Sequence, residues 1–138
     1  MKRLWILIVF YAFGIVGSLK AIVIDHSKLI IFGTIVSQPT ILVWNVAQLI
    51  LAFLIIVGFL RKKKIAWVLA YLEVGTAIAS GLISVIIVSE RQLSVVYPSV
   101  SIPLATYKML QVIGVLISCI VLGLLISTQK LVENKHKA

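Results

Sequence analysis

The chain has 138 residues, of which 62% are hydrophobic and 12% charged, and its formal net charge is +9 at pH 7. Soluble domains carry about 45–50% apolar and about 25% charged residues, so this composition excludes an ordinary water-soluble domain. Runs of about 20 apolar residues cross the hydrocarbon core of a bilayer, where the backbone must satisfy its own hydrogen bonds. We therefore expect an all-α membrane protein.

Four apolar segments are long enough to cross a bilayer as helices. They cover about residues 4–24, 41–60, 65–88 and 104–127. The first is too long for the apolar region of a signal peptide, and no small-x-small cleavage site follows it, so we expect it to be retained. The prediction is one domain, a four-helix up-down antiparallel bundle.

Basic residues gather on one side of this bundle. Nine of the 13 Lys and Arg residues precede the first segment, form the turn RKKK at 61–64, or lie after residue 127. Cytoplasmic loops collect Lys and Arg, which predicts a multi-pass protein of the cell membrane with both termini cytoplasmic. Nucleic acid is not an expected partner, because no segment could fold into a basic surface; the expected partners are the lipid bilayer and other membrane subunits or further copies of the chain.

Small residues and prolines suggest an internal organisation. Shifting the sequence by 64 residues aligns Ser37 with Ser101 and Pro39 with Pro103, which predicts a tandem repeat of two helices. Small residues allow helices to approach closely in lipid. On this basis we expect the first and third segments to pack most closely, through Gly14, Gly17, Gly75 and Gly81.

Polar residues within the apolar segments fall at two heights. With a rise of about 1.5 Å per residue, an inner layer holds Tyr11, Glu73, Ser118 and Cys119. An outer layer holds Lys20, Asn45, Gln48, Lys108 and Gln111, with Asp25 and Glu90 nearby in the loops. Ionisable groups inside a membrane are costly and are candidates for function.

Two interpretations of each layer remain open. Glu73 either bonds structurally to Tyr11 or Ser118, or contacts another subunit, or else it binds a proton or substrate. Lys20 and Lys108 either extend to the membrane surface or form an outward-facing site for a small anion or a carbonyl ligand such as a quinone.

Catalytic and metal-binding patterns are absent from the sequence. It contains no Ser/His/Asp set, phosphate loop or acidic pair, and its single Cys119 and the distant His26 and His136 give no metal or haem spacing. Catalysis by this chain alone is therefore not expected, and neither is a metal; a bound quinone or lipid is compatible with the polar layers.

The first half of the chain resembles DoxX-like membrane proteins. That family opens with an Arg, an apolar helix and a Gly closely followed by a Lys, matched here by Arg3, Gly17 and Lys20. A proline, a polar position, a Gly and a basic turn follow, matched by Pro39, Gln48, Gly58 and RKKK. Gln48 replaces the family's Glu. The resemblance covers about residues 3–70 and implies a membrane subunit of a redox assembly, often linked to quinone or thiol chemistry.

Two functions follow as hypotheses. The first is a non-enzymatic accessory or anchoring subunit of a larger, quinone-linked membrane assembly. The second is a small proton-coupled transporter that works as a homo-oligomer through Glu73. The stretch LEVGTAIASG at 72–81 resembles the Glu-bearing helix of small multidrug exporters, although in that family the Glu lies in the first helix.

Overall fold

The computed structural model describes the backbone of residues 2–23 and 28–137 and side chains up to residue 132, so Asp25 and His26 lie outside the described residues. The elements are α1 (Lys2–Val23), β1 (Lys28–Ile31), β2 (Thr34–Ser37), α2 (Thr40–Leu60), α3 (Lys64–Ile87), α4 (Glu90–Val96) and α5 (Leu104–Lys137). The four expected helices are confirmed. Pro39 and Pro103 directly precede α2 and α5, where a missing N–H costs no helical hydrogen bond.

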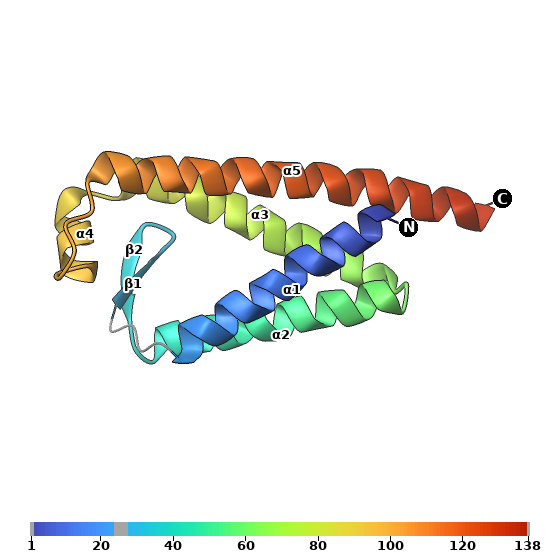
Figure 1. The fold of residues 1–138 in the computed structure, drawn as a ribbon, viewed down its shortest axis with the longest axis horizontal. Helices are drawn as coiled ribbons and strands as arrows, with labels where there is room; N and C mark the ends of the chain where they lie inside the picture. The colour runs from blue at the N-terminus through green and yellow to red at the C-terminus, as the bar shows by residue number, and fades with distance from the viewer. Residues whose placement is uncertain (1, 24–27, 138) are drawn as a thin grey trace.

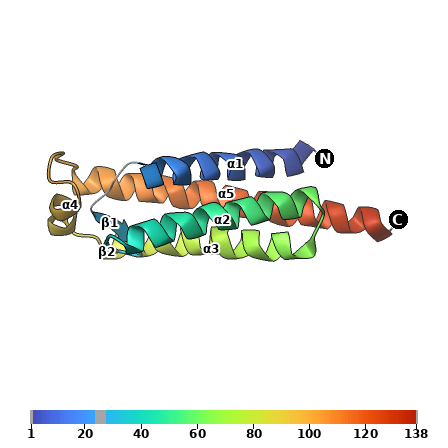
Figure 2. The same cartoon turned by 90° about the horizontal axis from the view of Figure 1, so that it is seen from below.

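The four long helices form an up-down bundle. Both termini and the α2–α3 turn lie at one end, and the strands and α4 lie at the other (Figures 1 and 2). We call these the basic end and the hairpin end. Each long helix has the length and apolarity of a membrane span, and at most 28% of any span is buried within the chain. Most of the helical surface is therefore available to lipid, as expected for a bundle in a bilayer.

The main core occupies only the half of the bundle nearest the basic end. Its fully buried side chains come from all four long helices and include Leu7, Ile55, Val74 and Leu125. The ring of Phe59 packs on Trp67 with centroids 4.8 Å apart. A smaller cluster of Val88, Leu93 and Tyr107 lies at the hairpin end. The helices thus meet tightly at one end of the bundle.

Two helix pairs, α1–α2 and α3–α5, make the closest contacts. In Figure 1 these pairs cross near the basic end and diverge toward the hairpin end. The α1–α2 pair corresponds to the first half of the proposed tandem repeat, and the α3–α5 pair corresponds to the second half. Our expectation that the first and third helices pack most closely is wrong, because α1 and α3 lie in different pairs.

The positions of glycines explain where the helix backbones approach one another. A Cβ built on Gly58 would lie 2.5 Å from Ala66 Cβ, at the α2–α3 turn, and one on Gly81 would lie 2.5 Å from Val115 Cγ2 on α5. Gly81 therefore does serve packing, but against α5. Gly14, Gly17 and Gly75 have no atom of another element within 4 Å of the Cβ position, so they make no close helix contact within the chain.

The hairpin end is closed by short elements that the sequence analysis treated as loops. β1 and β2 pair antiparallel around Phe32 and Gly33, whose φ angles of 50° and 71° suit a two-residue hairpin turn. The Phe32 ring packs on Trp44 of α2, and its N–H donates to Ser80 Oγ of α3 at 3.4 Å. Gln92 of α4 donates to the Gly33 carbonyl at 2.9 Å. The hairpin thereby joins α2, α3 and α4.

The glycine contacts give a matched test of packing. Gly58→Ala should destabilise the bundle by about 1–3 kcal/mol, because overpacking shifts neighbouring backbone. Gly14→Ala should be neutral or stabilise by up to about 1 kcal/mol, because alanine favours the helix and meets open space. Unfolding in detergent, followed by the fluorescence of the buried Trp67, measures both. Equal effects of the two substitutions would contradict this packing.

Candidate functional site

Tyr11 of α1 and Glu73 of α3 are polar side chains from different helices that meet at the core. A second such pair, Tyr71 of α3 and Gln129 of α5, is joined by a hydrogen bond from the Tyr71 hydroxyl to Gln129 Oε1 at 2.7 Å. The Tyr11 hydroxyl lies close enough to the Glu73 carboxylate to interact with it electrostatically. Neither Tyr11 Oη nor Glu73 Oε2 completes a hydrogen bond of regular geometry with the described residues, and both atoms are buried. The inner layer predicted from helix heights therefore brings Tyr11 and Glu73 together.

Apolar groups surround Tyr11, whereas Glu73 is partly buried. Tyr11 is 2% exposed, and its ring makes edge contacts with Phe10 and Phe59 at centroid distances of 5.5 and 6.1 Å. Val74 and Val121 belong to the same buried cluster. Burying polar atoms without regular hydrogen bonds costs free energy, so this pair is an unusual use of the core.

The other two members of the predicted inner layer do not join the pair. Ser118 Oγ donates to the Gly114 carbonyl of its own helix at 2.9 Å, and Cys119 is exposed. The expectation for these residues rested on their height along the bundle axis alone. Height could not fix the rotation of α5 about its own axis, which turns Cys119 outward.

The residues of the predicted outer layer are not assembled into one site. Asn45 is buried, Gln48, Lys108 and Gln111 are partly buried, and Lys20 is exposed. Within the described part of the chain, no hydrogen bond or ion pair connects them. The helix pairs diverge toward the hairpin end, which separates the α1–α2 pair from α5 there (Figure 1).

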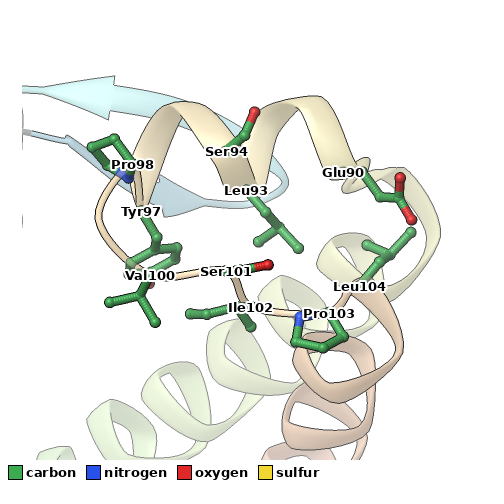
Figure 3. A pocket seen from close by; sticks show the side chains of 10 residues that line it. All are labelled: Glu90, Leu93, Ser94, Tyr97, Pro98, Val100, Ser101, Ile102, Pro103 and Leu104. Carbon is green, nitrogen blue, oxygen red and sulfur yellow. The ribbon is translucent and has the colours of Figure 1, made fainter.

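Two cavities lie at the ends of the bundle. The cavity at the hairpin end, of about 450 Å³, is formed by α4 and the segment 97–104. Leu93 points from α4 toward Ser101 and Ile102 there (Figure 3). The cavity at the basic end, of about 650 Å³, lies among α1, α2 and α5. Neither cavity is lined by Tyr11 or Glu73.

Comparisons with known proteins do not assign a family. No family model, curated protein or solved structure matches the chain. The resemblance of residues 3–70 to DoxX-like proteins therefore stays a prediction. Among the described residues, no group of three or more His, Cys, Asp or Glu side chains could hold a metal ion.

Sequence reasoning missed Thr128. This residue of α5 is 3% exposed, and its Oγ1 has no hydrogen-bond partner among the described residues. The predicted helix ended at about residue 127, whereas α5 continues to Lys137. The apolar pair Leu131 and Val132 beyond Gln129 and Lys130 was the available signal that the helix continues.

A double-mutant cycle tests the Tyr11–Glu73 interaction. We expect Tyr11→Phe and Glu73→Met to be non-additive, with a coupling free energy of about 0.5–2 kcal/mol, as for polar neighbours in one network. Unfolding of the wild type, both single variants and the double variant in detergent gives this value. Additivity within about 0.5 kcal/mol would show that the two side chains do not interact.

Proposed function

We propose that this chain is a non-catalytic integral membrane subunit that anchors or accompanies partner membrane proteins. The observation that carries the proposal is the position of its interior polar pair: Tyr11 is buried in the core, Glu73 Oε2 is buried, and neither residue lines either of the two cavities described above. A transport pathway would need a cavity that reaches Glu73. If the interior of the bundle is packed, the membrane-facing surface is the part of the molecule that binds partners.

Small residues on α1 supply the surface for a partner helix. Gly14 and Gly17 are one helical turn apart, are exposed, and have open space at their Cβ positions. Since Gly58 and Gly81 already serve the contacts within the chain, the glycines on α1 are free for contacts between chains. Close approach of backbones at small residues is a main source of helix association in lipid.

The remaining features of the proposal follow from the sequence. The concentration of Lys and Arg at the basic end supports a cytoplasmic position for both termini. The resemblance to DoxX-like proteins supports a partner assembly with redox chemistry, in which a quinone or lipid is the expected small ligand.

A double substitution on α1 tests the subunit proposal. Gly14→Leu/Gly17→Leu should abolish co-purification of partner chains in mild detergent while leaving the fold intact, because both positions are exposed and a Cβ at either one meets open space. Mass spectrometry of the purified complex identifies the chains that are lost. Ala12→Leu, an exposed small residue on the opposite flank of α1, is the matched control and should retain them. A wild-type protein that purifies as a partner-free homo-oligomer contradicts the proposal.

One observation favours a second candidate, the proton-coupled transporter. Glu73 Oε2 is buried and has no hydrogen-bond partner among the described residues. A carboxylate that exchanges a proton for a substrate would also lack a hydrogen-bond partner in one state of the transport cycle. The closed ends of the bundle would then have to open during transport.

Glu73→Gln separates the two candidates. A transporter should lose substrate flux or drug resistance in cells, because the amide cannot bind and release a proton at neutral pH. A subunit should keep its partners and its cellular phenotype, because the amide preserves the size of the side chain. Comparison of expression-matched cells carrying wild type, Glu73→Gln and an empty vector makes the measurement.

A further inference from the structure

The cavity at the basic end combines features of a ligand site. Its volume of about 650 Å³ falls within the range of small-molecule sites, about 300–1,000 Å³. Three cationic side chains line it, Lys2 and Arg3 from α1 and Lys62 from the α2–α3 turn. Ile8, Phe59 and Thr128 form its buried wall.

The three cations are available to an anion. All three side chains are exposed, and none forms an ion pair with a carboxylate in the described part of the chain. Among the residues whose side chains the structure describes, no carboxylate lines the cavity. Bringing three like charges together is unfavourable unless a negative group lies between them, so the charge of this site is complementary to an anion.

Thr128 is a polar residue that lines the same cavity. Its hydroxyl is buried and has no hydrogen-bond partner among the described residues. The neighbouring Ser127, by contrast, donates to the Leu124 carbonyl at 3.1 Å. A buried hydroxyl without a partner costs free energy, and an acceptor on a bound molecule would remove that cost.

The other walls of the cavity are apolar. Ile8 and Phe59 are buried, and Leu131 and Val132 of α5 extend the apolar surface. A free phosphate ion would leave these walls without a partner. A molecule with an anionic head and a hydrocarbon chain would contact both halves of the site.

We propose that this cavity binds an anionic phospholipid. The phosphate lies among Lys2, Arg3 and Lys62, an ester oxygen accepts a hydrogen bond from Thr128, and an acyl chain packs on the apolar wall. Basic pockets between membrane helices are suited to such head groups, and hydrogen bonds between cations and phosphate are among the stronger ones in proteins. The site is independent of the proposed role as a subunit.

Native mass spectrometry of the full chain in detergent tests the site. Dioleoylphosphatidylglycerol should bind with a stoichiometry of one and about tenfold more tightly than dioleoylphosphatidylcholine, because about three cations contact the anionic head group. The variant Lys2→Gln/Arg3→Gln/Lys62→Gln should lose this preference. Arg61→Gln/Lys63→Gln/Lys64→Gln removes the same charge from residues that do not line the cavity, and it should keep the preference.

Thr128→Val provides an independent readout that leaves the charges in place. It should lower the affinity for phosphatidylglycerol several-fold without destabilising the lipid-free protein, because no hydrogen bond within the chain is lost. Ser127→Ala should leave the affinity unchanged. Any of three results would overturn the proposal: equal binding of the two lipids, an equal loss of the lipid preference in the two charge variants, or displacement of the lipid by excess inorganic phosphate.

Discussion

The fold depends on where two helix backbones can approach each other, because lipid tails are as apolar as the side chains they would replace and provide no hydrophobic force between helices. Gly58 against Ala66 brings α2 and α3 together at their turn, and Gly81 against Val115 joins α3 to α5. Around the contact of Gly58 with Ala66 the core forms at the basic end. Toward the hairpin end the helix pairs diverge, and β1, β2 and α4 make the contacts there.

This arrangement separates three environments along the bundle. At the basic end, cationic side chains border a cavity with apolar walls that is also lined by Thr128, whose buried hydroxyl has no hydrogen-bond partner among the described residues. In the core, Tyr11 is surrounded by apolar groups, and the partly buried Glu73 lies beside it. At the hairpin end, Gln92 binds both the N-terminus of α4, through the Ser89 N–H at 2.9 Å, and the Gly33 carbonyl. Chemistry that crosses the membrane would have to connect these environments, whereas binding at the surface requires no such connection.

The sequence predicted the spans well because an apolar run in lipid has little alternative to a helix. It also predicted that Tyr11 and Glu73 share a height, since the helical rise is constant. It could not predict helix rotation, so Cys119 was placed in the inner layer although it is exposed, and the outer polar residues were placed on a common site that does not form. Two local signals were overlooked: Phe-Gly between β-branched residues marked the hairpin, and Ser89 followed by Gln92 has the spacing of a capping box.

Accessibility of the two ends tests the account most directly. In a Cys119→Ala background, Lys63→Cys reports the basic end and Ser99→Cys the hairpin end, and both residues are exposed. A membrane-impermeant maleimide applied to right-side-out and inverted vesicles should label the two cysteines from opposite faces, with tags at both termini on the face of Lys63→Cys. Labelling of both cysteines from one face, or termini on opposite faces, would contradict the four-span bundle.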